Sequence, residues 1–238
     1  MKYCTDREAK DALIAIGHQL YQQGLIVGTD GNLSCRVTRD TLWTTATGAR
    51  KGFLTDEWLV KTDLEGNLLE GTRKPSSELK MHLCLYKANP CALAAVHTHP
   101  PFSTAFAAAN LGFDKMLLAE EGLYLGHVQV APYASPGSME LAESILPYCR
   151  NNNAVLLANH GAVTWGRDVV QAWHRTQALE QYCIGKTADE VAGIALDDAG
   201  KATDADLIAG ITMPLGDFIA GVVGACNNAR VNGAKEGD

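Results

Sequence analysis

The sequence predicts a single α/β domain whose central sheet is mixed and largely antiparallel. Short apolar and β-branched runs are more frequent than an alternating strand–helix–strand pattern requires, and some are close enough together to form hairpins. Amphipathic segments of helical period lie among these runs and can pack on the sheet. The 238 residues contain no internal repeat and can bury one full core. We therefore expect one domain over residues 1–238.

The first third of the chain predicts two helices and a hairpin. Thr5 and Glu8 have the spacing of a capping box, and Gly24 supplies a helix stop. The segment Pro75-Ser76-Ser77-Glu78 has a helix-start composition, with a serine cap and an early carboxylate. The expected elements are a helix over about residues 6–23, hairpin strands over 33–37 and 41–45, and a helix over 79–88.

The remainder predicts alternating strands and helices. Buried strands are expected over residues 92–98, 128–131, 154–158 and 162–165. Expected helices follow Pro100-Pro101, begin at Ser138 with a disturbance at Pro147, and extend from Asp168 to about Val191. Beyond Gly193 we expect a small-residue helical segment over 213–226 and a frayed tail over 227–238.

Composition excludes several classes of protein. The net charge of −7 and a pI near 5.5 argue against a nucleic-acid or acidic-membrane partner, because both need a basic face. No apolar stretch reaches the roughly 18 residues of a membrane helix, and the first residues do not resemble a signal peptide. Seven scattered cysteines without a C-x-x-C pair fit free thiols better than disulfides. These features predict a cytoplasmic location.

The His-x-His of residues 97–99 is the strongest functional signal. His97 and His99 should project to the same side of a buried strand, because side chains alternate along a strand. His160 follows another apolar run, and Gly161 after it permits a sharp turn that would leave the imidazole at the strand's end. Three such histidines fit an open zinc site, with hydrogen-bonded core histidines as the alternative. Of the other histidines, we expect structural or surface roles for His18, His127 and His174.

Three turns that could bind an anion come before these histidines. Each can offer backbone N–H or hydroxyl groups, and the serine pair would do so at a helix N-terminus, where the dipole also favours negative charge. Taken singly, each is as well explained as an ordinary turn or cap. They are Gly31-Asn32, Thr47-Gly48 and Ser76-Ser77.

The order of these motifs along residues 6–190 resembles the class II aldolase/adducin family, and most closely its zinc-dependent L-fuculose-1-phosphate aldolases. The matching stretches are Gly31-Asn32-Leu33-Ser34, Thr47-Gly48, Pro75-Ser76-Ser77-Glu78, Val96-His97-Thr98-His99, Ala131-Pro132-Tyr133-Ala134 and Asn159-His160-Gly161. The resemblance implies a three-layer α/β/α fold and a homotetramer with the active site near a subunit interface. It implies one Zn²⁺ per subunit on His97, His99 and His160, and a substrate phosphate held by Gly31, Asn32, Thr47, Gly48, Ser76 and Ser77.

The resemblance also implies a reaction. A ketose 1-phosphate, such as fuculose 1-phosphate or a related deoxy-ketose 1-phosphate, would be cleaved to dihydroxyacetone phosphate and an aldehyde. A metal stabilises the charge that cleavage develops, and a carboxylate moves the proton at the donor carbon. Glu78 is the candidate acid/base, with a glutamate that serves only the helix dipole as the alternative. We expect His82, one helical turn later, to be a core residue rather than a partner of the site.

Related reactions stay open because the match to the aldolases is incomplete. Where those aldolases carry a tyrosine that protonates the leaving group, residues 113–121 contain none, and the next candidate is Tyr124. Beyond Tyr182 the sole aromatic residue is Phe218, whereas the family's tail supplies an aromatic lid. The alternatives are a sugar-phosphate 4-epimerase, a 3-oxo sugar-acid phosphate decarboxylase, a methylthioribulose-1-phosphate dehydratase and, least favoured, a non-catalytic adducin-like assembly domain.

Overall fold

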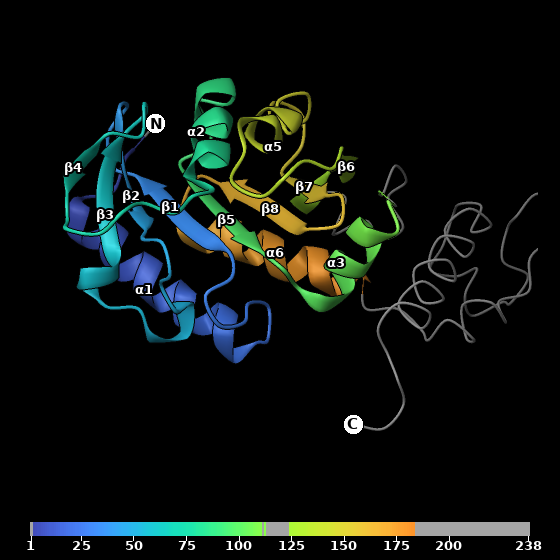
Figure 1. Cartoon of the computed structure of the whole chain (residues 1–238), viewed down its shortest axis with the longest axis horizontal. Coiled ribbons are helices and arrows are strands. Elements are labelled where there is room, and N and C mark those ends of the chain that lie inside the picture. Colours follow the sequence, from blue (N-terminus) through green and yellow to red (C-terminus); the bar gives the residue numbers. More distant parts are fainter. Residues whose placement is uncertain (1, 111, 113–123, 184–238) are drawn as a thin grey trace, which may run out of the picture.

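The computed structural model describes residues 2–110, 112 and 124–183 (Figure 1). The helices are α1 (Asp6–Gln22), α2 (Leu79–Ala88), α3 (Pro101–Ala108), α5 (Met139–Ser144) and α6 (Val169–Cys183), with single-turn 3₁₀ helices η1 (Lys51–Phe53) and η2 (Asp56–Trp58). The strands are β1 (Asn32–Arg36), β2 (Thr41–Thr45), β3 (Leu59–Asp63), β4 (Leu68–Glu70), β5 (Ala94–Thr98), β6 (Gln129–Ala131), β7 (Ala154–Leu157) and β8 (Gly161–Gly166).

These strands form one sheet in the order β4-β3-β2-β1-β5-β8-β7-β6. Neighbouring strands in the described part of the chain run antiparallel except for β6 and β7, which are parallel. The expectation of a mixed, largely antiparallel sheet is confirmed. The central position of β5, between β1 and β8, matters for function because β5 carries His97 and leads into His99.

Helices cover both faces of the sheet, as the resemblance implied (Figure 1). On one face, the apolar sides of α2 and α5 pack against strand residues such as Val163 and Trp165. On the other, α1 and α6 enclose a second cluster around Leu33 and Val96. Each cluster removes its apolar side chains from water, and this burial is the main stabilising contribution to such a domain. The fold is a three-layer α/β/α domain.

Most local predictions hold. Thr5 and Glu8 form the expected capping box at the start of α1, and β1 pairs with β2 as the expected hairpin. The sheet also extends through β3 and β4, which were not expected, because β2 pairs with β3 and β3 with β4. The predicted continuation of the last helix to Val191, the segment over 213–226 and the tail over 227–238 lie outside the described residues.

No helix in the described part of the chain is both long and apolar enough to cross a membrane.

Candidate active site

Strands β5 and β8 bring the three predicted histidines together. His97 lies in β5 opposite Val163 of β8, His99 follows β5 directly, and His160 lies in the turn that leads into β8. The ring centroids are 4.9 Å apart for His97–His99, 4.8 Å for His97–His160 and 4.9 Å for His99–His160. One ring nitrogen from each lies within 4.8 Å of the others, so the three could hold a metal ion.

The turn at His160 differs in detail from the prediction. The left-handed backbone falls on Asn159, at φ 54°, and not on Gly161. Asparagine tolerates this conformation better than most residues. Gly161 is required for space instead, because a Cβ there would lie 2.5 Å from His99 Cδ2 and 2.5 Å from the Thr98 carbonyl oxygen. The glycine therefore lets the His99 ring approach the other two histidines.

Hydrogen bonds orient the rings for metal binding. His97 Nδ1 lies 2.8 Å from the Ala162 carbonyl oxygen, which can only accept, so Nδ1 carries a proton and Nε2 is the nitrogen left to bind a metal. His99 Nδ1 lies 3.6 Å from the Asp30 carboxylate, which favours the proton there as well. The two Nε2 atoms are then 3.2 Å apart. Nitrogens about 2.05 Å from one tetrahedral zinc would be about 3.3 Å apart, so the spacing fits such an ion.

Burial favours the neutral, metal-binding form of the imidazoles. It lowers the pKa of His160 to about 4, with a further contribution from the neighbouring His97. It also lowers the pKa of His99. Neutral imidazole is the form that binds metals, so these rings can bind one without first losing a proton at neutral pH.

Glu78 lies against the histidines and occupies the N-cap position of α2. Its Oε2 is 3.1 Å from His97 Nε2, and its Oε1 is 3.3 Å from His160 Nε2. Burial alone would raise the pKa of Glu78, but the hydrogen bond and charge of His97 and the charge of His160 lower it to about 2. The N-cap residue is Glu78, whose side chain makes no cap hydrogen bond, and the serine at this helix start is Ser76, whose Oγ accepts from the Glu78 N–H over 3.3 Å. The carboxylate is turned toward the imidazoles and not toward the helix N-terminus.

Asn32 supports this carboxylate. Its Nδ2 donates a hydrogen bond to Glu78 Oε2 over 3.2 Å, and the residue is 1% exposed. Asn32 lies opposite His97 across the β1–β5 pair, which brings it beside the carboxylate. The side chain predicted to hold phosphate therefore contacts Glu78.

A cavity of about 310 Å³ adjoins these groups. Five of the six predicted phosphate residues line it, and Asn32 is not among its lining residues. The lining residues are Thr29, Asp30, Gly31, Ala46, Thr47, Gly48, Lys51, Ser76, Ser77, Glu78, His99, Pro136 and His160. The cavity thus extends from the imidazoles and Glu78 to the three predicted anion-binding turns.

Two of these turns are hydrogen-bonded to each other. Thr47 donates from its backbone N–H to the Lys74 carbonyl over 2.9 Å and from Oγ1 to the Pro75 carbonyl over 2.8 Å. The N–H of Ser76 bonds the Thr45 carbonyl over 3.2 Å. In the remaining turn, Gly31 has φ 66°, and a Cβ there would clash with the His97 carbonyl oxygen.

Sequence reasoning did not identify Lys51, the lysine among the cavity-lining residues. It is 2% exposed, and its Nζ donates to the carbonyl oxygens of Thr29 and Ala49. Two of its three N–H donors thereby join the loops that carry Gly31 and Gly48. Burial lowers its pKa to about 8, against the attraction of Asp30 and Glu78. Nothing in the local sequence distinguishes this lysine from a surface lysine.

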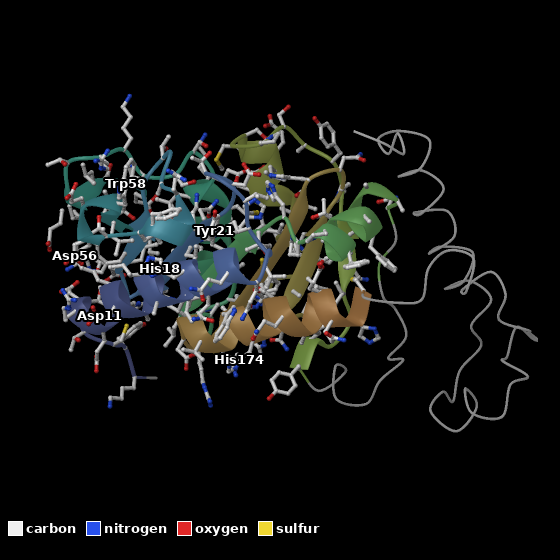
Figure 2. The ribbon with its side chains drawn as sticks, turned by 90° about the horizontal axis from the view of Figure 1, so that it is seen from below. Asp11, His18, Tyr21, Asp56, Trp58 and His174 are labelled. Atoms are coloured by element: carbon white, nitrogen blue, oxygen red, sulfur yellow. The ribbon has the colours of Figure 1, made fainter. Side chains whose placement is uncertain are left out.

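Among the described side chains, the remaining histidines and the tyrosines lie apart from the cavity lining. Figure 2 shows His18 on α1 and His174 on α6, in the helical layer on one side of the sheet. His82 is fully buried, with Nδ1 2.7 Å from Ser34 Oγ, as expected for a core residue. Tyr124 is 52% exposed and does not line the cavity. Residues 113–121, where the fuculose-phosphate aldolases carry the leaving-group tyrosine, and Phe218 lie outside the described residues.

Comparison with known proteins gives consistent results. A family model described as Class II Aldolase and Adducin N-terminal domain matches residues 11–184. The 3-oxo-tetronate 4-phosphate decarboxylase of Haemophilus influenzae is 39% identical over 181 residues, which cover 74% of this chain and 86% of that protein. The L-fuculose phosphate aldolase of Methanococcus maripaludis is 37% identical over 168 residues, covering 71% and 90%. A solved L-fuculose 1-phosphate aldolase superposes with a TM-score of 0.72 at 29% identity, covering 82% and 93%.

Proposed function

Because this chain belongs to the class II aldolase and adducin family, we propose that it is a metal-dependent enzyme that cleaves a carbon–carbon bond in a phosphorylated sugar. One observation carries the proposal. Three imidazoles lie against the Glu78 carboxylate, and two of them line with it a cavity whose other walls include the predicted anion-binding turns. The metal-binding and acid/base groups at one end of this cavity suit bond cleavage, and the turns suit a phosphate.

In this proposal, His97, His99 and His160 hold one Zn²⁺ per subunit. The set of three nitrogens, the 3.2 Å spacing of two of them and the hydrogen bond that fixes the His97 tautomer all suit a catalytic zinc site. When bound, the ion supplies a Lewis acid that polarises the substrate carbonyl and stabilises the negative charge of bond cleavage.

Glu78 is the proposed acid/base. The neighbouring imidazoles lower its pKa, so the carboxylate is ionised at neutral pH and can accept a proton from the donor carbon when the bond is being formed. In the cleavage direction it returns that proton to the same carbon. Asn32 holds the carboxylate in place through its hydrogen bond to Oε2.

The turns that line the cavity form the proposed phosphate site. Ser76 and Ser77 precede α2, so the positive end of the helix dipole faces an anion bound there. The glycines of the other two turns contribute backbone donors, and Thr47, whose own donors bond the Lys74 and Pro75 carbonyls, fixes its turn beside them. Lys51 adds one positive charge, which suits a dianionic phosphate.

The leading substrate is a ketose 1-phosphate, such as fuculose 1-phosphate or a related deoxy-ketose 1-phosphate. Its cleavage gives dihydroxyacetone phosphate and an aldehyde, and the similarity to L-fuculose phosphate aldolases supports this choice. We further propose a cytoplasmic homotetramer with its active sites near subunit interfaces, which light scattering on the purified protein would test.

A 3-oxo sugar-acid phosphate is the second candidate substrate. Decarboxylation also leaves the bonding electrons on carbon, but carbon dioxide departs without a proton donor or acceptor on the leaving group. The described lining of the cavity contains no tyrosine that could transfer a proton to or from a leaving group. This favours decarboxylation, which needs no such proton transfer. The decarboxylase of Haemophilus influenzae supports the same alternative.

A product screen tests the proposal. Zinc-loaded protein is incubated with fuculose 1-phosphate, a 3-oxo-tetronate 4-phosphate, ribulose 5-phosphate and methylthioribulose 1-phosphate. Triose phosphate plus aldehyde supports the leading reading, and carbon dioxide from the 3-oxo acid supports the second. Release of an epimer or a dehydrated product alone, or no turnover of any compound by zinc-loaded protein, would contradict both.

A further inference from the structure

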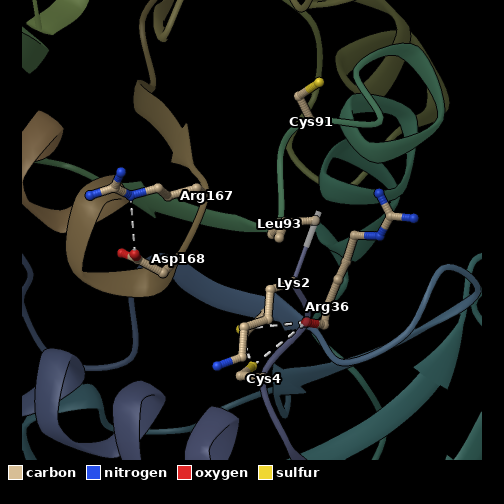
Figure 3. A pocket seen from close by; sticks show the side chains of 8 residues that line it. Lys2, Cys4, Arg36, Cys91, Leu93, Arg167 and Asp168 are labelled. Carbon is tan, nitrogen blue, oxygen red and sulfur yellow. Dashed lines mark hydrogen bonds and ion pairs between the residues drawn. The ribbon is translucent and has the colours of Figure 1, made fainter.

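A second pocket, of about 420 Å³, brings together three cysteines that are far apart in the sequence (Figure 3). Cys4 lies ahead of α1, Cys35 lies in β1, and Cys91 lies in the turn before β5. The other lining residues are Lys2, Arg36, Leu93, Arg167 and Asp168. Among the described residues, the three sulfur atoms do not group as a metal site. This pocket shares no lining residue with the candidate active site.

Two of these sulfur atoms are in contact. The Sγ atoms of Cys4 and Cys35 are 3.5 Å apart. Both also face the carbonyl oxygen of Arg36, at 3.7 Å from Cys4 and 3.9 Å from Cys35 (Figure 3). A disulfide bond is about 2.05 Å long, so a movement of about 1.5 Å would allow bonding. Cys4 precedes the first helix, so that movement need not disturb the sheet.

The two thiols differ in access and in acidity. Cys4 is partly exposed in the pocket, whereas Cys35 is 3% exposed. The hydrogen bond from Cys35 lowers the pKa of Cys4, although burial opposes this. The same contact, together with burial, raises the pKa of Cys35. An oxidant from solvent would therefore meet Cys4 first, as the more accessible and more acidic thiol.

The pair lies on the side of the sheet opposite to the α2 helix. Cys35 packs in the apolar cluster formed with α1 and α6. Its neighbour Ser34 points to the other face, where its Oγ contacts His82 and Tyr86 of α2. Chemistry at Cys35 is thereby separated from the helix that begins next to Glu78.

We propose that Cys4 and Cys35 are a redox-sensitive dithiol that a hydroperoxide converts to a disulfide. The Cys4 thiolate attacks the peroxide, forming a sulfenic acid; with hydrogen peroxide and one proton, water leaves. The Cys35 thiol then attacks the sulfenic sulfur, forms the S–S bond and expels a second water. Two thiols are oxidised by two electrons and one peroxide is reduced. The product ties the segment ahead of α1 to strand β1.

Peptide mapping tests this pairing on the full chain. The reduced protein is treated with equimolar hydrogen peroxide, remaining thiols are alkylated, and the linked peptides are identified by mass spectrometry. The expected result is a Cys4–Cys35 disulfide, with a melting temperature roughly 5–10 °C higher than that of the reduced protein. A Cys4–Cys91 link, or a Cys4 that stays a free thiol or oxidises without pairing, would overturn the proposal.

Three variants make the test specific. Cys91→Ser is the matched control from the same pocket and should form the disulfide as the wild type does. Cys4→Ser should lose the melting-temperature shift. In Cys35→Ser, whose hydroxyl can still donate to Cys4, the Cys4 sulfenic acid should persist and be trapped by dimedone. Absence of the dimedone adduct in Cys35→Ser, or a melting-temperature shift kept in Cys4→Ser, would show that Cys4 is not the oxidised thiol.

Discussion

Asn32 and Glu78 are joined by a 3.2 Å hydrogen bond between the first residue of β1 and the residue ahead of α2. The contact crosses from the sheet to the helical layer. This hydrogen bond should be stronger than one between neutral groups, because its acceptor is a charged carboxylate. The proposed acid/base group is thus held from the strand next to the one that carries His97.

Replacing Asn32 by alanine should reduce kcat without weakening phosphate binding. Loss of one hydrogen bond to a charged group costs about 1.5–3 kcal/mol, or roughly a ten- to hundredfold lower rate if the bond persists in the transition state. Steady-state kinetics with inorganic phosphate as a competitive inhibitor would measure both effects. An unchanged kcat with a raised phosphate inhibition constant would instead return Asn32 to the phosphate site.

Replacing Glu78 by glutamine should leave the bound metal in place and slow proton exchange at the donor carbon by roughly a hundredfold or more. The amide keeps the shape of the side chain but cannot accept the proton. Deuterium exchange into the donor substrate, followed by NMR, gives the rate. Glu140→Gln, in the first turn of α5, is a control that should exchange at the wild-type rate.

Replacing His97 or His160 by alanine should remove the metal. Each change deletes one of three converging nitrogens, and two ligands are too few for a stable zinc site. Metal content after dialysis, measured by plasma mass spectrometry, should fall from one ion per subunit to near zero. His174→Ala on α6 should retain the full content. A metal-free wild-type protein that remains active would refute the assignment.

Replacing Lys51 by methionine should raise the Michaelis constant for a phosphorylated substrate by about tenfold or more, because a charge-assisted contact is lost. Lys87→Met, which removes an exposed ion pair with Glu65, should have no effect. The pKa of Lys51 near 8 adds a second expectation. Phosphate affinity of the wild type should fall as the pH rises through about 8, and the methionine variant should lack that step.

His82 should make the folded protein sensitive to acid. Burial lowers its pKa to about 3 from an ordinary value of 6.5, so the folded state binds fewer protons than the unfolded state between these values. The free energy of unfolding should therefore decrease as the pH falls from about 6.5 toward 3. His82→Asn keeps a partner for Ser34 and should show a weaker decrease. Urea titrations of both proteins with a chelator present would compare the slopes.

The clustering of the three histidines was predicted well because its signal is local. His97 and His99 are two residues apart on one strand, and His160 follows an apolar run, so strand geometry alone brings them near the sheet's end. The hairpin and the first helix also depend on short-range signals. The predicted role of Gly161 in the backbone turn was wrong, because the constraint is the His99 ring, which only the tertiary structure places there.

The rest of the site depends on contacts between distant segments. Lys51 is buried only because the loops that carry Thr29 and Ala49 enclose its ammonium group. The direction of the Asn32 side chain follows from the pairing of β1 with β5. Strand β4 is exposed along its length and lacks the buried apolar run that marks a core strand. Neither composition nor periodicity reveals which distant segments will pack against each other, or that an exposed segment will pair as an edge strand.

The backbone bridge between Ala46 and Pro75, with the Thr47 and Ser76 hydrogen bonds beside it, bears on the entropy of binding. These contacts fix the loop that carries Thr47 to the loop that carries Ser76 before any anion binds. Without them, each loop would lose conformational entropy separately when the anion binds. A bound phosphate then pays little for ordering them, and more of its contact energy appears as affinity. Calorimetry of phosphate binding should consequently give a less unfavourable entropy for the wild type than for Thr47→Val, which lacks the hydroxyl donor to Pro75.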